Sequence, residues 1–139
     1  MASIQRIHHA AIVVQDLEAG LRFWRDALGL QLDHVEDIPE QVSRIAFLPV
    51  GDAEIELVLP TTEDSGIARY LAKRGPGIHH VCLEVDDLTG MLDQLRRHNI
   101  RLINEQPVVG AGGRLAAFIH PESTGGVLLE LYQTAGSWG

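Results

Sequence analysis

The chain has 139 residues, of which 45% are hydrophobic and 22% charged, which suffices for one globular domain with a sizeable core. Its formal net charge of −8, from 11 Lys+Arg and 19 Asp+Glu, argues against nucleic acid or an anionic membrane as a partner. The single cysteine excludes an intrachain disulfide framework. We expect no secretory leader and no membrane span, and therefore a cytoplasmic protein.

The first half of the chain predicts one strand, one helix and three further strands. A strand rich in Ile, Val and Ala is expected over Arg6–Val14. Asp16 then predicts the N-cap of a helix over Leu17–Ala27, which Gly29 ends. The later strands of this half are expected over Gln31–Val35, Val42–Leu48 and Ala53–Leu59.

The second half repeats this order after a helical connector. The connector predicts a helix over Ser65–Lys73 that ends at the glycines and proline of positions 75–77. A strand over Gly77–Val85 and a helix over Leu88–Arg97 follow. The last strands are expected near Leu102–Asn104 and over Leu115–His120 and Val127–Tyr132.

An internal repeat explains why the two halves share this order. Shifting the chain by 71 residues makes seven of the fifteen positions 7–21 identical to positions 78–92, where about one identity is expected by chance. A shift of 74 then places Glu56 on Glu130. The repeat predicts an α+β fold: a single domain, 1–139, of two βαβββ units over about 4–60 and 77–133, joined by the connector 61–76. Its eight strands would form a curved mixed sheet around a metal-binding cleft.

The alternation of side chains along the strands singles out four polar residues. Apolar neighbours such as Ala10 and Ile12 are expected to face a helix, which directs His9, and by the repeat His80, to the other side. The same parity places Glu56 and Glu130 opposite their leucine neighbours. Two imidazoles and two carboxylates suit a divalent Zn, Co, Ni, Mn or Fe ion. Such an ion could act as a Lewis acid that stabilises an enolate.

Other polar residues have plainer interpretations. His8 and His79 are expected to be buried or half-buried and to form local hydrogen bonds. Glu54 shares a face with Glu56 and is expected to be solvated, whereas Glu84 lies on the His80 side as a rim charge or a second acid. Cys82 is expected to be a small core residue.

The motifs at these positions resemble those of the vicinal oxygen chelate superfamily and, over nearly the whole chain, those of the methylmalonyl-CoA epimerases. The doubled histidine of the second repeat and the segment from His120-Pro121 to Leu131 carry the epimerase resemblance. The matching stretches are Ile7–Ile12 with Asp16-Leu17, Phe47–Pro60, Gly77–Val81 and Phe118–Leu131.

This resemblance implies a metal-dependent isomerase that interconverts (R)- and (S)-methylmalonyl-CoA by proton transfer at the α-carbon. It implies that His9, Glu56, His80 and Glu130 bind one divalent metal ion, Co, Ni, Mn or Zn, and that Glu130 also transfers the proton. An acyl-CoA substrate and a homodimer follow from the same resemblance. One position departs from some members, which carry a second glutamate where this chain has Ile45. Glu84, Glu54 or a metal-bound water could then serve as the second base, or the substrate differs.

Three alternative functions belong to the same fold. A glyoxalase I-like lyase that acts on a glutathione hemithioacetal uses the same ligand order, but its last strand usually follows a different turn from the one at His120-Pro121. A ring-cleaving dioxygenase would use two histidines and one glutamate, which leaves Glu56 without a role. A non-enzymatic protein that binds small molecules, such as a drug-sequestering protein, generally lacks the metal ligands.

Overall fold

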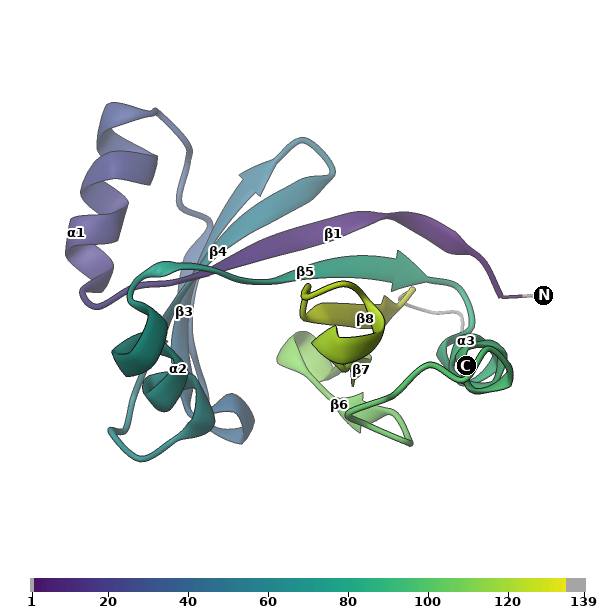
Figure 1. The fold of residues 1–139 in the computed structure, drawn as a ribbon. Coiled ribbons are helices and arrows are strands. Elements are labelled where there is room, and N and C mark those ends of the chain that lie inside the picture. The colour runs from purple at the N-terminus through teal and green to yellow at the C-terminus, as the bar shows by residue number, and fades with distance from the viewer. Residues whose placement is uncertain (1, 135–139) are drawn as a thin grey trace. The chain divides into compact units, whose positions relative to one another are not determined.

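The structure, a computed structural model, describes residues 2–134 and alternates strands and helices in the order that the repeat predicts (Figure 1). No helix within those residues is long and apolar enough to span a bilayer. The elements are β1 (Ile4–Val13), α1 (Leu17–Leu21), η1 (Arg22–Ala27), β2 (His34–Ile38), η2 (Pro39–Gln41), β3 (Ser43–Val50), β4 (Ala53–Pro60), α2 (Gly66–Arg74), β5 (Gly77–Val85), α3 (Leu88–Arg97), β6 (Val108–Val109), η3 (Ala111–Gly113), β7 (Leu115–Ile119), η4 (Pro121–Ser123) and β8 (Leu129–Gln133).

The strands are hydrogen-bonded in the order β2-β3-β4-β1-β5-β8-β7-β6. The pairs β1–β4 and β5–β8 are parallel, and the pairs β2–β3, β3–β4, β6–β7 and β7–β8 are antiparallel. This mixed eight-stranded sheet confirms the predicted α+β fold class. The chain divides into two compact units: the first-repeat unit is His9–His79, and the second-repeat unit comprises residues 2–8 and 80–134.

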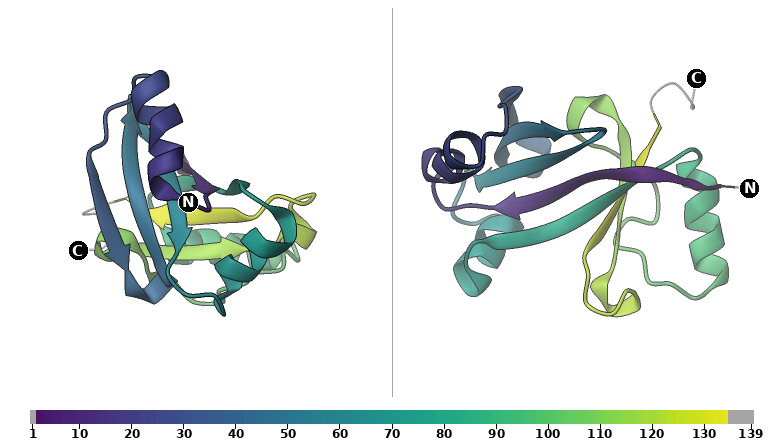
Figure 2. Two further views of the ribbon diagram at one scale, coloured as in Figure 1. Left: turned by 90° about the vertical axis from the view of Figure 1, so that its left-hand side faces the viewer. Right: turned by 90° about the horizontal axis from the view of Figure 1, so that it is seen from above.

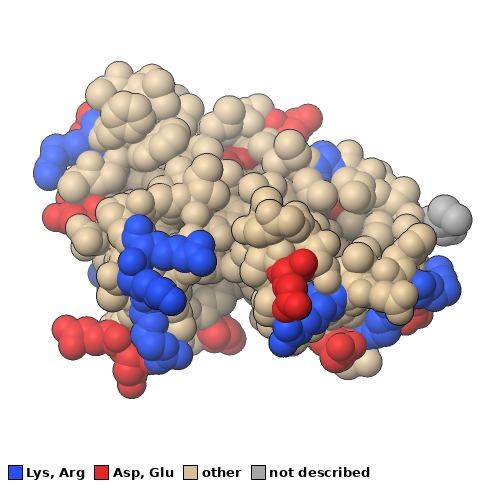
Figure 3. Space-filling view, viewed as in Figure 1, with Lys and Arg blue, Asp and Glu red and all other residues tan. Residues whose placement is uncertain are grey.

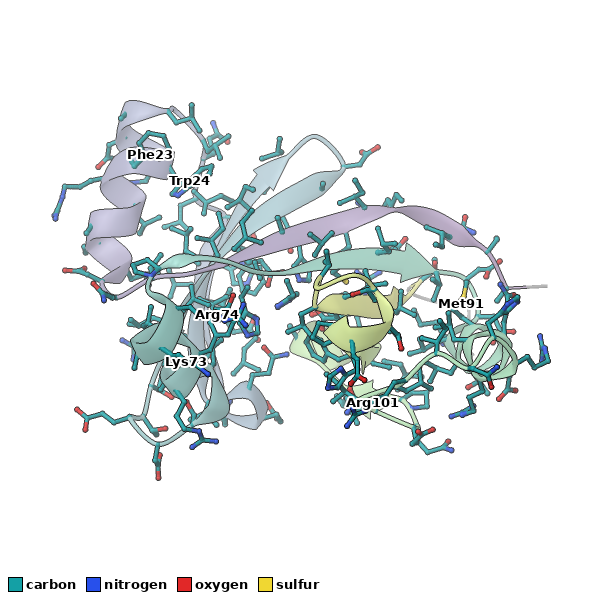
Figure 4. All side chains as sticks on the ribbon, in the orientation of Figure 1. Phe23, Trp24, Lys73, Arg74, Met91 and Arg101 are labelled. Atoms are coloured by element: carbon teal, nitrogen blue, oxygen red, sulfur yellow. The ribbon has the colours of Figure 1, made fainter. Side chains whose placement is uncertain are left out.

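The core of the first-repeat unit lies between α1 and one face of its strands (Figure 2). Asp16 caps α1 as predicted, because its carboxylate accepts a hydrogen bond from the Ala19 amide at 3.2 Å. Gly29 follows the helical segment with φ = 93°, a left-handed conformation that favours glycine. The buried members of this core are Val14, Leu21, Ala46, Leu48 and Leu57, with Trp24 packed against them (Figure 4).

The core of the second-repeat unit is built in the same way from α3 and the alternate residues of β5, β7 and β8. Asp87 caps α3 by accepting from the Gly90 amide at 3.0 Å, the counterpart of the Asp16 cap. Met91 is buried on the sheet-facing side of α3 (Figure 4). The buried members of this core are Val85, Leu88, Met91, Leu92, Leu102, Ala117, Ile119 and Leu131.

Two local predictions are wrong. The second strand lies at His34–Ile38 rather than Gln31–Val35, because Leu30 and Leu32 pack against the first core from a loop. The segment Leu102–Asn104 forms a single bridge from Leu102 rather than a strand, and the edge strand is instead the two-residue β6. The helix predicted over Leu17–Ala27 has the predicted bounds, and it continues from Arg22 as a π-helix.

Candidate metal and acid–base site

The first-repeat unit brings His9 and Glu56 together. His9 Nδ1 lies 3.1 Å from Glu56 Oε2, and the two side chains are 0% and 4% exposed. The parallel register of β1 and β4 explains the contact, since His9 is opposite Glu54 and Ala11 is opposite Glu56. Ligand atoms of His9, Glu54 and Glu56 all lie within 4.8 Å of one another.

The second-repeat unit brings His80 and Glu130 together. His80 Nε2 lies 2.9 Å from Glu130 Oε1, and the two side chains are 11% and 2% exposed. The parallel register places Cys82 opposite Glu130. His80 is two residues before Cys82 and therefore lies on the same face of β5. The Phe118 ring contacts the imidazole of His80 edge-on at a centroid distance of 5.2 Å and helps to orient it.

The donor set of each pair fits a divalent metal ion. Two ligand atoms about 2.1 Å from one ion and at right angles to each other are about 3.0 Å apart. The nitrogen–oxygen separations of 3.1 Å in the first pair and 2.9 Å in the second match that spacing. Each pair also opposes the apolar face that packs on its own unit's helix, as strand alternation predicts.

The two other histidines of the doubled motifs lie in different units. His8 is buried, as expected, but its hydrogen bond to Arg114 is not local, because the two residues are 106 positions apart, and its ring contacts that of Tyr132. The reason is that β1 contributes residues up to 8 to the second-repeat unit and residues from 9 onward to the first. His79 is half-buried, and its ring meets that of Tyr70 at 4.7 Å.

Glu84 is a buried anion between two guanidinium groups. Arg114 Nη2 donates to Glu84 Oε1 at 2.8 Å, and Arg6 donates to both carboxylate oxygens at 3.4 Å. Burial raises the pKa of the Glu84 carboxyl, but the charges and hydrogen bonds of Arg6 and Arg114 outweigh burial and hold the pKa below its ordinary value. Arg114 was not predicted from the sequence. It precedes the helix-facing Leu115 after a glycine-rich loop, so strand alternation places it on the Glu130 face.

The third strand carries no carboxylate on the Glu56 face. Ile45 and Phe47 occupy that face of β3, where Phe47 pairs with Glu56 and Ile45 with Val58. Ile45 is 2% exposed. An apolar side chain therefore fills the position where some epimerases carry a glutamate.

Comparisons with known proteins agree with this arrangement. Residues 8–118 match the Glyoxalase/Bleomycin resistance protein/Dioxygenase superfamily. The mitochondrial methylmalonyl-CoA epimerase of Mus musculus is 39% identical over 129 residues, which are 92% of this chain and 72% of that protein.

Two solved structures are similar over nearly the whole chain. The methylmalonyl-CoA epimerase of Mycobacterium tuberculosis has a TM-score of 0.89 and 38% identity, covering 97% of this chain and 91% of that one. A methylmalonyl-CoA epimerase solved in complex with methylmalonyl-CoA and NH4+ has a TM-score of 0.89 and 33% identity, covering 97% and 98%. The chain therefore belongs to the methylmalonyl-CoA epimerase family within the Glyoxalase/Bleomycin resistance protein/Dioxygenase superfamily.

Proposed function

We propose that this protein is an isomerase that interconverts (R)- and (S)-methylmalonyl-CoA by moving the proton on the α-carbon. The observation that carries the proposal is the matched His–Glu pair in each repeat of a chain that belongs to the epimerase family. The similar epimerase solved with methylmalonyl-CoA supports the acyl-CoA substrate class.

His9, Glu56, His80 and Glu130 would together hold one divalent ion, Co, Ni, Mn or Zn. The nitrogen–oxygen spacing in each pair and the burial of His9, Glu56 and Glu130 support this assignment, and His80 is half-buried. When bound, such an ion supplies a Lewis acid that lowers the energy of the enolate formed when the α-proton leaves.

Glu130 would also transfer the proton on one side of the α-carbon. Its Oε1 contacts His80, and a carboxylate has about four lone-pair positions, so the group can contact the imidazole and still accept a proton. The packing of the Glu130 side chain, 2% exposed, excludes bulk water from the carboxylate.

Epimerisation requires a proton donor on the opposite side of the planar enolate as well. Glu84 is a poor candidate, because its two arginine partners keep it anionic and because four residues along β5, about 13 Å, separate it from His80. Glu54 lies in the ligand-atom cluster of His9 and Glu56 and remains a candidate, together with a metal-bound water.

Basic residues on α2 are candidates for contacts with the CoA phosphates. Figure 3 shows basic side chains gathered over α2, and Figure 4 labels Lys73 and Arg74 there. The Arg74 guanidinium lies over the Tyr70 ring at 5.2 Å, which restricts its conformations. This local positive charge would offset the net charge of −8 for an anionic substrate.

Two further parts of the proposal concern the state of the protein in the cell. A homodimer is expected from the family resemblance, and light scattering of the purified protein measures its mass directly. A cytoplasmic location is expected from the sequence, and cell fractionation tests it.

Two assays on the metal-loaded protein test the proposed activity. Incubation with methylmalonyl-CoA in heavy water should place deuterium on the α-carbon, and chelation should abolish the exchange. If exchange is absent while the hemithioacetal of methylglyoxal and glutathione is consumed, the protein is a glyoxalase. A protein that takes up no divalent metal on titration would contradict both enzymatic functions.

A further inference from the structure

The first-repeat unit holds a third potential metal ligand beside His9 and Glu56. Glu54 lies two residues before Glu56 on β4 and therefore on the same face of that strand. The parallel register of β1 and β4 places Glu54 opposite His9. The ligand atoms of the three side chains all lie within 4.8 Å of one another. Two ligand atoms on opposite sides of one ion are about 4.2 Å apart, so the three donors are close enough to share one ion.

No basic side chain pairs with Glu54 in the part of the chain that the structure describes. Its neighbour on β3 is Pro49, which carries no charge. Two carboxylates as close as those of Glu54 and Glu56 repel each other unless a cation or a proton lies between them. Glu84 has the opposite surroundings, since it pairs with two arginines. A metal ion bound by both carboxylates would remove the repulsion between Glu54 and Glu56.

Glu54 is not part of the duplicated ligand set. The shift of 74 residues that places Glu56 on Glu130 places Glu54 on Leu128, whose side chain has no donor atom. The repeat therefore supplies no counterpart of Glu54, and its role has to be inferred from its own surroundings. Glu54 is half-buried, so binding an ion does not require a fully buried charge to be exposed first.

We propose that Glu54 is a fifth protein ligand of the divalent ion that the proposed function assigns to His9, Glu56, His80 and Glu130. The inference rests on that proposed metal site and extends it to the choice of metal. Five protein ligands leave one position of a six-coordinate ion open. An added carboxylate stabilises bound Mn more than bound Zn, because Mn favours oxygen ligands and six-coordination, whereas four ligands suffice for Zn.

Titration calorimetry of the metal-free protein with Mn and Zn salts tests the inference. With Glu54→Ala, we expect the affinity for Mn to fall about 10-fold or more and the affinity for Zn to fall less than about threefold. Glu54→Gln keeps an oxygen donor and loses the charge, so it should recover part of the affinity for Mn. Glu63→Ala is the matched control and should bind both metals as the wild type does, since Glu63 is an exposed glutamate of the same unit.

Four outcomes would contradict parts of this account separately. Wild-type affinity for Mn in Glu54→Ala would overturn the inference, and loss of deuterium exchange in that variant would then make Glu54 the second base. Equal losses in Glu54→Ala and Glu54→Gln would show an effect of charge alone and would also overturn it. Equal losses for Mn and Zn would contradict the effect on the choice of metal. A wild-type protein that binds metal without exchanging the α-proton would contradict the proposed function and leave the Glu54 inference standing.

Discussion

At the scale of single residues, the neighbours of each proposed functional side chain restrict where that side chain lies and which charge it carries. His9 and His80 each meet a buried glutamate from the neighbouring parallel strand. His34 offers a contrast, because it lies between Asp33 and Glu36 on an exposed strand edge. Its pKa is raised, first by the hydrogen bond to Asp33, although desolvation opposes the shift.

This contrast supplies a test of metal binding. We expect His9→Ala to weaken binding of one equivalent of Co or Zn ion by at least about 10-fold, because a ligand is lost. His34→Ala should leave the affinity for the metal and the stoichiometry unchanged, since His34 is exposed and is not one of the proposed ligands. Titration calorimetry of metal-free protein measures both. Retention of wild-type affinity by the His9 variant would remove His9 from the ligand set.

Glu84 makes stability depend on pH in a defined direction. Because its pKa is lowered in the folded state, its contribution is present above the ordinary value of about 4.5 and is lost as the pH falls through the lower folded value. We expect Glu84→Gln to lower the free energy of unfolding by about 1.5–3 kcal/mol at pH 7. That difference should shrink when urea unfolding is repeated below about pH 4. Glu122→Gln, at an exposed pair, is the control, and a difference that is constant with pH would contradict this account.

At the scale of elements, local signals predicted some boundaries to the residue and missed others. The predicted bounds of β5 and α3 are those observed, since Gly75 and Pro76 precede β5 and Asp87 caps α3. The edge strand β2 mixes charged and apolar residues that are little buried. The predicted strand was therefore placed too early in the chain, over the apolar Leu32 and next to Leu30. The two residues of β6 are too few for any periodic signal.

The two matched caps give a test at this scale. Asp16→Ala and Asp87→Ala should each lower the free energy of unfolding by about 1 kcal/mol, because each carboxylate satisfies an amide of the first helical turn. Asn substitutions at the same positions should recover most of the loss, since the amide oxygen can also accept the bond. Urea titration measures the effect, and alanine variants as stable as wild type would show that the caps contribute nothing.

At the scale of the whole molecule, the repeat predicted the fold class and the pairing of one His with one Glu in each half. It did not predict where the compact units divide. The first residues of the chain join the second-repeat unit, where Ser3 hydrogen-bonds to the Asp86 carboxylate at 2.8 and 3.1 Å and Arg6 pairs with Glu84. Contacts between residues far apart in the chain produce no periodic pattern in the sequence. For the same reason the sequence did not predict the partners of His8 and Arg114.

Because β1 contributes to both units, we propose that the chain unfolds as the single domain that the repeat predicts. Urea transitions followed by far-UV and near-UV circular dichroism should coincide, as expected of one cooperative unit. Two separated transitions would show that the repeats unfold independently.

The central claim is that Glu130 of β8, which is paired with His80 of β5, transfers the α-proton of methylmalonyl-CoA. Deuterium incorporation into that substrate in heavy water, followed by NMR with the metal-loaded protein, tests it most directly. The wild type and the exposed control Glu122→Gln should exchange at equal rates, whereas Glu130→Gln should be slower by about 10²- to 10⁴-fold. Exchange by Glu130→Gln at the wild-type rate would contradict the account.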